Sequence, residues 1–525
     1  MQNKKDNQAS SITKSAGVVA SAVLLSRITG LLREMTIAAI FGAGVATDAF
    51  FVAFRIPATL RQLFAEGGIN AAFIPVLSDY KKGNKVAAEK FAGNVITVFS
   101  LIVIAVILGV ELFPEIVVKI FASGLSEETF NLTVLLTRMI FPYIWLISMV
   151  AFLGGILNTY GYFFAPAISQ VILNLSIIGF AFFMGNGIFG FPPITALAYG
   201  VLTGGILQLL LQVVYLPKTK LNLKTTIDLK DRGLIEVFKL LIPTLLGVMV
   251  YQLNVLVSTQ LASYLEKGSI SFLYYADRLI QLPIGVFAFA ISTATLPALA
   301  LNHAENKKNE AVDLLMFSLK LNFFLVIPVM FIYMVLSSEI VDILYRRGAF
   351  SIATRNATAL ALKMYALGLW SSSGVRILAP FFLSRKEPKV PLTSSSVSLV
   401  TNFVLSIVLM RYFQFAGLAF SVAIASMVNF SILFFLAHRR DDSIAIERLF
   451  GSLWKIIVSS IVVFIILLLI KQFWSYPFNS GFIIRFSWIS IMVILGGTVY
   501  IIFSKILKID EMSFLWKGVK KKLWH

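Results

Sequence analysis

The sequence predicts an all-α integral membrane protein with 14 transmembrane helices. Of its 525 residues, 58% are hydrophobic and only 14% are charged, which leaves too little polar surface to cover a water-soluble globule. Uncharged runs such as Leu240 to Leu265 and Tyr412 to Ala437 exceed the about 20 residues that cross a bilayer as a helix. Lys and Arg gather in alternate loops, as they do in polytopic membrane proteins.

The predicted helices alternate with short polar segments along the chain. The uncharged run from Phe141 to Pro217 is long enough for three of them, separated at Asn158–Gly161 and at Gly185–Gly187. We expect the 14 helices to begin near Ser15, Asp48, Val86, Phe130, Gly161, Pro192, Leu234, Ser271, Ala311, Thr354, Pro388, Phe415, Ser452 and Gly481.

The distribution of basic residues predicts the topology. One set of alternating segments carries most Lys and Arg, within 4–14, 81–90, 218–232, 307–308, 385–389, 439–448 and 517–522. The other set carries few: Lys119, Lys267, Arg346, Arg347, Arg355, Arg411, Lys471 and Arg485. Because basic loops stay on the cytoplasmic side, both termini are expected there. The formal net charge of +19 is therefore attributed to topology and to anionic lipid head groups, not to nucleic acid binding. The Arg346–Arg347 pair does not fit this pattern.

The chain repeats itself at an offset of 224 to 226 residues. Glu115-Ile116-Val117 recurs as Glu339-Ile340-Val341, and Gly124 recurs as Gly348. A duplicated unit of six helices enters the membrane in the same direction twice, as in transporters whose lobes are related by an axis along the membrane normal. We expect an N-terminal cytoplasmic tail (1–14), an N-lobe (15–220), a cytoplasmic linker (221–233), a C-lobe (234–440), a C-terminal helix pair (452–506) and a basic cytoplasmic tail (507–525).

Charged residues are concentrated in the first two helices, where facing lipid would cost about 2.5 to 3.5 kcal/mol per central charge. They are Arg27, Arg33, Glu34, Asp48, Arg55, Arg61 and Glu66, and the eighth helix adds Asp277 and Arg278. Two interpretations stay open. They form ion pairs between helices, or they line a water-filled cavity for an anionic ligand. Arginine outnumbers the nearby acids in the first half, and its rigid fork suits phosphate oxygens, which favours the cavity.

Two further groups of residues have two interpretations each. Gly42-Ala43-Gly44 and Gly67-Gly68 flank the second helix, where they serve as hinges or as points of close packing. Thr393, Thr401, Asn402 and the serines at 394–396 lie in the eleventh helix, where they bind a cation or, as we favour, form hydrogen bonds between helices.

The stretch from Ser26 to Tyr80, which includes SRITGLLRE, ATDAFF and FAEGGINAAF, closely resembles the start of the MurJ, or MviN, family of lipid II flippases. Three later blocks resemble the same family, at Phe141–Ala167, Tyr274–Ala300 and Leu378–Pro391. The resemblance implies two six-helix lobes with a C-terminal helix pair, a central cationic cavity and a groove for a polyprenyl tail. It also implies an alternating-access flippase in the bacterial inner membrane that carries lipid II, an undecaprenyl-diphosphate-linked disaccharide-pentapeptide.

The resemblance also implies which residues bind the substrate. Family positions match Ser26, Arg27, Arg33, Asp48, Arg61 and Arg278, and Arg55 joins them because it shares a helical stripe with Asp48. Two positions depart from the family. Gln281 stands where some members have a glutamate, and the seventh helix offers Gln252, Asn254 and Gln260 without the acid of the family's sodium site. A sodium site is therefore not assigned, and whether the chain binds a metal ion stays open.

Other classes of protein fit the sequence less well. A multidrug exporter of the same superfamily should have 12 helices and an acidic cavity, whereas a flippase for another polyprenyl-diphosphate oligosaccharide stays open as an alternative. A membrane glycosyltransferase would need catalytic acids on a long loop, and neither Glu127-Glu128 nor Asp441-Asp442 lies in one, so we expect no enzyme. A non-transporting scaffold would not need buried arginines.

No cofactor or macromolecular partner is required by the sequence. It lacks a GxxxxGK[ST] nucleotide-binding pattern, so any energy should come from an ion gradient, the membrane potential or consumption of the substrate. We expect a monomer surrounded by membrane lipids, and an association with the cell-wall synthesis machinery stays open.

Overall fold

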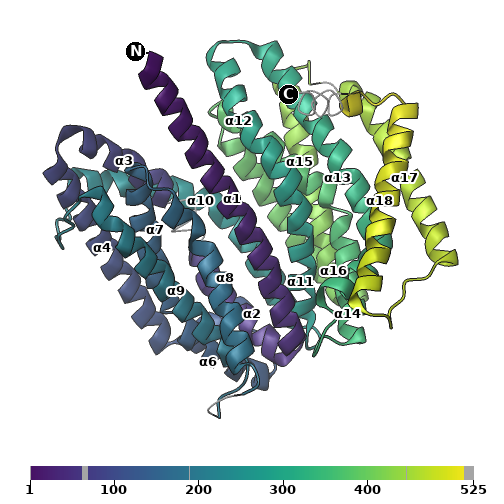
Figure 1. Cartoon of the computed structure of the whole chain (residues 1–525), viewed down its shortest axis with the longest axis horizontal. Coiled ribbons are helices and arrows are strands. Elements are labelled where there is room, and N and C mark those ends of the chain that lie inside the picture. The colour runs from purple at the N-terminus through teal and green to yellow at the C-terminus, as the bar shows by residue number, and fades with distance from the viewer. Residues whose placement is uncertain (1, 62–68, 188–189, 445, 514–525) are drawn as a thin grey trace. The chain divides into compact units, whose positions relative to one another are not determined.

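The computed structural model describes residues 2–61, 69–187, 190–444 and 446–513, and within these ranges the regular structure is entirely helical (Figure 1). The helices of the first half are α1 (Gln2–Phe41), α2 (Val45–Arg61), α3 (Ile69–Gly83), α4 (Lys85–Leu112), α5 (Pro114–Ala122), α6 (Glu127–Ile140), α7 (Tyr143–Thr159), α8 (Phe164–Met184), α9 (Thr195–Tyr215) and the short η2 (Leu216–Thr219). Those that follow are α10 (Arg232–Ala262), α11 (Ser269–Pro283), η3 (Ile284–Ala288), α12 (Phe289–Ala304), α13 (Lys308–Tyr345), α14 (Ile352–Ala366), α15 (Leu369–Ser384), α16 (Lys389–Arg440), α17 (Ile446–Phe473) and α18 (Phe482–Ile506).

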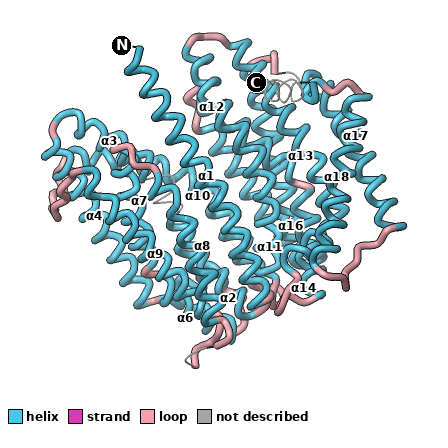
Figure 2. The backbone as a smooth tube through the Cα atoms, in the orientation of Figure 1, coloured by secondary structure: helices cyan, strands magenta, loops and turns pink. Residues whose placement is uncertain are grey.

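The predicted membrane spans correspond to these helices, which are joined mostly by short loops (Figure 2). All 14 predicted starts lie in a helix or within three residues of one. Within the described ranges, nine helical segments are long and apolar enough to cross a membrane, and the bent pair α14–α15 makes a tenth. Of the remaining predicted spans, α1, α2 and α10 hold three and the second half of α16 holds one. The chain is therefore an all-α, multi-pass membrane protein, as predicted.

The 52-residue α16 is two spans folded into a tight hairpin. Its helical geometry breaks at Gln414, whose φ of 52° is left-handed, one residue before the predicted start at Phe415. Hydrogen bonds then join the two arms: Ser406 to Ser421 at 2.6 Å, and the Ser398 hydroxyl to the Ala425 carbonyl at 2.8 Å. Of the polar residues for which we favoured hydrogen bonds between helices, Ser394 donates to the Asn429 carbonyl at 3.1 Å and Asn402 accepts from Ser421 at 3.1 Å. Thr393, Ser396 and Thr401 instead donate to carbonyls of their own helix.

The chain divides into two compact units, each with its own core. The first comprises Met1–Ser271 with Arg347–Phe350, and the second comprises Phe272–Arg346 with Ser351–His525. Stacked and edge-to-face phenylalanines from α3, α4 and α7 fill a core of the first unit, among them Phe73, Phe91 and Phe152. The helix α10 packs against α3 and α5, so it belongs to this unit. The lobe boundary that we expect at residues 221–233 stays a prediction.

The second unit has a core shared by α13, α15, α16, α17 and α18. Phe323, Phe381, Phe430 and Trp488 are buried in it, and α18 packs beside α17 and α13. Tyr500 on α18 donates a hydrogen bond to the Phe324 carbonyl at 2.8 Å. The predicted C-terminal helix pair is therefore built into the core of this unit.

The backbone supports the repeat that the sequence predicts. Phe113 separates α4 from α5, and α13 loses helical geometry at Leu336, 224 residues after the end of α4 at Leu112. Gly161 and Lys386, 225 residues apart, both have positive φ, at 86° and 61°. Breaks and turns thus recur at the offset at which sequence letters recur.

The segment that joins α9 and η2 to α10 is held on α4. The buried Asn94 donates to the Asp228 carbonyl at 2.8 Å and accepts the Asp228 N–H at 2.7 Å. One residue earlier, a Cβ on Gly93 would lie 2.1 Å from the Lys224 carbonyl oxygen, so only glycine allows this approach. The predicted linker is a docked strap.

Candidate functional site

Two side-chain amides of α8 hold two arginines of the first unit. Arg33, only 8% exposed, donates to Asn174 Oδ1 at 3.0 Å and pairs with the neighbouring Glu34. The Asn174 amide nitrogen in turn reaches Thr29 Oγ1 at 3.1 Å and the Ser26 carbonyl at 3.2 Å. One asparagine thus ties the Ser26 and Arg33 turns of α1 to α8.

Arg61 is held by the same face of α8. Its guanidinium at the end of α2 donates to Gln170 Oε1 at 2.8 Å. Gln170 and Asn174 are four residues apart, so they are neighbours on one face of the helix. Sequence reasoning missed both, although two amides at this spacing in an otherwise apolar helix are a signal for it. The two arginines therefore converge on one stretch of α8.

Arg27 differs from the other arginines of the first unit. Its side chain is partly buried on α1, and within the described ranges it makes no hydrogen bond or ion pair. A guanidinium has five N–H donors, and one that makes no hydrogen bond within the protein offers all five to a ligand. Arg27 is thus the arginine best able to accept a new anionic partner.

Asp48 is occupied by the protein itself. Its carboxylate accepts the Gly268 N–H at 2.6 Å, the Ser271 N–H at 2.9 Å and the Ser271 hydroxyl at 2.6 Å. These groups belong to the first turn of α11, so Asp48 caps that helix from α2 and its charge complements the helix dipole. Its geometry is that of a positioning residue, and substrate contact by Asp48 stays a prediction.

Arg55 faces the same part of the chain as Asp48. It donates to the hydroxyl of Thr259 on α10. The shared stripe that we expected from the seven-residue spacing therefore points both side chains of α2 at the α10–α11 segment.

The turn before α2 is tightly packed. Gly42 has a φ of +65°, and a Cβ there would lie 2.6 Å from the Ala349 carbonyl oxygen. The close-packing interpretation applies to Gly42, and Gly67-Gly68 lie outside the described residues.

Arg278 belongs to the second unit. It is exposed on α11, and its guanidinium lies 4.7 Å from the centre of the Tyr274 ring. The neighbouring Asp277 accepts a hydrogen bond from Gln281 at 3.3 Å, so the Gln281 amide bonds within its own helix. A shared cavity for Arg278 and the arginines of the first unit stays a prediction.

The described arginine site holds Arg27, Arg33, Arg55 and Arg61, with Glu34 and Asp48 on the same two helices. Within the described ranges, no group of three or more His, Cys, Asp or Glu side chains could hold a metal ion. Arginines whose partners are mostly neutral amides and hydroxyls can bind a phosphate group through charge-assisted hydrogen bonds.

Comparison with known proteins gives consistent matches. The family model described as "Lipid II flippase MurJ" matches residues 37–492. A "Probable lipid II flippase MurJ" of Buchnera aphidicola subsp. Schizaphis graminum is 36% identical over 97% of this chain and 100% of its own length. A solved structure titled "Lipid II flippase MurJ, inward closed conformation" has a TM-score of 0.79 and 29% identity, and the match covers 94% of this chain and 99% of that one.

The fold is also shared more widely. An inward-facing multidrug resistance MATE transporter of the MOP superfamily has a TM-score of 0.68 over 82% of this chain and 98% of its own. Its identity is only 15%, so this likeness concerns the fold alone.

Proposed function

Because this chain belongs to the lipid II flippase MurJ family, we propose that it moves lipid II from the cytoplasmic to the periplasmic leaflet of the bacterial inner membrane. Both termini lie in the cytoplasm in this proposal, and the two lobes alternate in opening the substrate cavity to either side. The substrate's diphosphate must leave water to cross, and protein donors replace that solvation.

The observation that carries the site assignment is the convergence of Arg33 and Arg61 on the Gln170–Asn174 face of α8. A neutral amide orients a guanidinium without cancelling its charge, so the outer donors remain strong for phosphate oxygens. Arg27 adds an arginine with no hydrogen bond or ion pair within the part of the chain that the structure describes. Ser26, Arg55 and Arg278 complete the proposed binding set, with Asp48 positioning α11.

The test is a flipping assay in proteoliposomes that contain this chain as the only protein. Wild type should move lipid II between leaflets, and Arg27→Gln should slow it by about tenfold or more, since one charge-assisted hydrogen bond contributes about 1.5 to 3 kcal/mol. Arg411→Gln is the matched control, because Arg411 is an exposed arginine outside the proposed site. No movement of lipid II by wild type would overturn the function. Equal rates for an unrelated polyprenyl-diphosphate oligosaccharide would favour the broader alternative.

The topology is tested separately by cysteine labelling. The chain has no native cysteine, so a single Ser10→Cys variant gives an unambiguous signal. An impermeant thiol reagent added to intact spheroplasts should not label it, whereas the same reagent should label it after lysis. Labelling before lysis would reverse the proposed orientation.

A further inference from the structure

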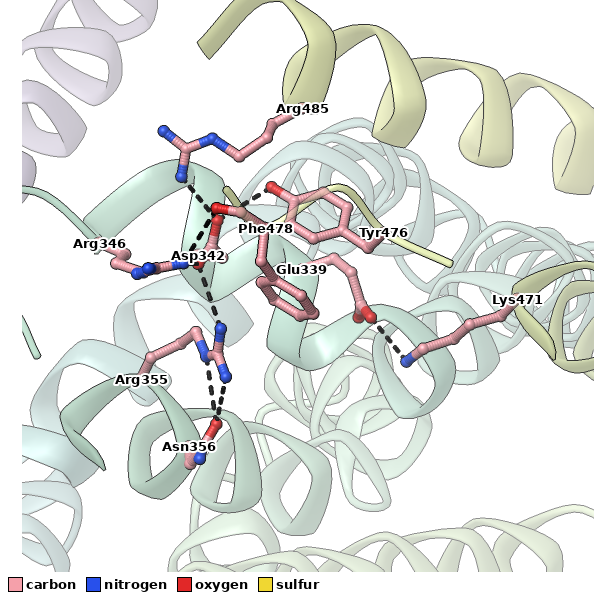
Figure 3. A network of polar contacts seen from close by, with 9 residues as sticks. All are labelled: Glu339, Asp342, Arg346, Arg355, Asn356, Lys471, Tyr476, Phe478 and Arg485. Carbon is pink, nitrogen blue, oxygen red and sulfur yellow. Dashed lines mark hydrogen bonds and ion pairs between the residues drawn. The ribbon is translucent and has the colours of Figure 1, made fainter. Parts of the chain in front are cut away.

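A second group of arginines lies in the second unit, far in sequence from the first (Figure 3). We call Asp342, Arg346, Arg355, Tyr476 and Arg485 the Asp342 cluster. Asp342 Oδ1 accepts from Arg346 at 3.1 Å and from Arg355 at 3.4 Å. Its Oδ2 accepts from Arg485 at 2.8 Å and from the Tyr476 hydroxyl at 3.1 Å. The end of α13, the start of α14, the α17–α18 loop and the start of α18 thus meet at one carboxylate.

The charges of the Asp342 cluster do not balance. Three guanidinium groups share one carboxylate, whose side chain is fully buried. The adjacent pair of Lys471 and Glu339, 2.7 Å apart, is balanced by itself. The arginine side chains are only 22%, 11% and 15% exposed, so water screens the two excess positive charges poorly. Uncompensated charge with so little solvent is costly, and a further anion would offset it.

Two of the three arginines have donors to spare. Arg355 uses all three of its nitrogens, because it also donates from Nε and Nη2 to Asn356, and it lies over the Phe478 ring. Arg346 uses only Nη1, which reaches Asp342 and the Phe478 carbonyl. Arg485 also uses only Nη1, and its Nε is buried with no partner within the described ranges. Arg346 and Arg485 can therefore present further N–H groups to one anion.

The position of the Asp342 cluster indicates the kind of anion. It lies where α17 ends and α18 begins, beside large exposed side chains: Phe473 at 88%, Trp474 at 45%, Phe482 at 49% and Ile483 at 77%. Tryptophan and tyrosine, here Trp474 and Tyr476, mark the level of the lipid head groups in membrane proteins. The commonest anion at that level is the phosphate of a phospholipid.

The Tyr476 hydroxyl acts as a fixed donor in this arrangement. Burial raises the pKa of Tyr476 above its ordinary value, and the Asp342 carboxylate raises it further. The phenol therefore stays protonated at physiological pH, and Asp342 keeps its partner on that side.

We propose that the Asp342 cluster binds the phosphate of an anionic phospholipid, with Arg346 and Arg485 as the residues that donate to it. Asp342, Arg355 and Tyr476 hold the two donors in place. The bound lipid would then fasten the α17–α18 pair at the membrane surface. This site includes none of the arginines of α1 and α2.

The experiment measures lipid retained by the purified full chain in native mass spectra. Wild type is incubated with dioleoyl-phosphatidylglycerol, with dioleoyl-phosphatidylcholine or with inorganic phosphate. We expect phosphatidylglycerol to be retained preferentially, because its net negative charge offsets the excess of the cluster. The double variant Arg346→Gln/Arg485→Gln leaves a balanced Arg355–Asp342 pair, and it should retain phosphatidylglycerol at least about tenfold more weakly.

Two controls separate the outcomes. Arg411→Gln removes an exposed arginine elsewhere in the chain and should retain the lipid as wild type does. Arg346→Lys/Arg485→Lys keeps the charge and should fold if the Gln variant does not, with intermediate retention. Equal retention by wild type, the double Gln variant and the control would overturn the proposal. Displacement of the lipid by inorganic phosphate, with equal thermal stabilisation, would assign the site to free phosphate instead and overturn the lipid source.

Discussion

The two arginine groups of this protein differ in the side chains to which the guanidinium groups donate. On α1 and α2, Arg55 and Arg61 donate to the neutral side chains of Thr259 and Gln170, and Arg33 donates to Asn174 and pairs with Glu34. In the Asp342 cluster, three arginines share one buried carboxylate. A neutral partner fixes the direction of a guanidinium and leaves its charge for a ligand that must come and go. A buried acid makes a permanent junction between helices. We therefore assign the first group to transport and the Asp342 cluster to the anchoring of helices.

Breaking the junction should have the largest effect. Asp342→Asn leaves three crowded guanidinium groups without their anion, which should lower the free energy of unfolding by about 3 to 5 kcal/mol. Thermal unfolding of the purified variant measures this. Unchanged stability would show that the cluster is not a junction, and Asp313→Asn, at an exposed acid of α13, is the matched control.

Removing one arginine of the first group should act on transport instead. Arg61→Ala should slow flipping by about tenfold to a hundredfold, because a charge-assisted hydrogen bond contributes about 1.5 to 3 kcal/mol. Arg61→Lys keeps the charge without the fork and should be intermediate. Flipping rates in proteoliposomes give the comparison, with membrane insertion checked in each variant. Full activity of Arg61→Ala would remove Arg61 from the site.

A third variant gives Arg61 an acidic partner, as the arginines of the Asp342 cluster have. Gln170→Glu gives Arg61 a permanent acidic partner at nearly the same geometry, so the ligand must compete with it. We expect flipping to slow by about tenfold while thermal stability stays equal or rises. A variant that flips as fast as wild type would contradict the view that neutral partners matter.

The smallest effect should come from the phenol of the Asp342 cluster. Tyr476→Phe removes one of four hydrogen bonds to the carboxylate and should cost about 0.5 to 1.5 kcal/mol of unfolding free energy, with transport unaffected. A loss as large as that of Asp342→Asn would mean that the arginines contribute little.

The helices were largely predictable from the sequence, whereas the partners of the charges were not. The charged Arg411 between two apolar runs predicted even the division of α16, which the structure places at Gln414. Gln170 and Asn174 mark a polar face of α8, but their spacing does not reveal which side chains that face meets. The Asp342 cluster joins residues up to 143 positions apart, so no local pattern could predict it. It accounts for Arg346, which did not fit the charge pattern.

The strap that Asn94 holds against α4 limits how α10 can move within the first unit. A free connector of a dozen residues would allow α9 and α10 to separate by tens of ångströms. With Asp228 pinned to Asn94 and Asp231 capping the first turn of α10 at 2.9 Å, almost no slack remains between α4 and α10. Any large movement of α10 must therefore be a swing about this pinned end, with the far end of the helix travelling furthest.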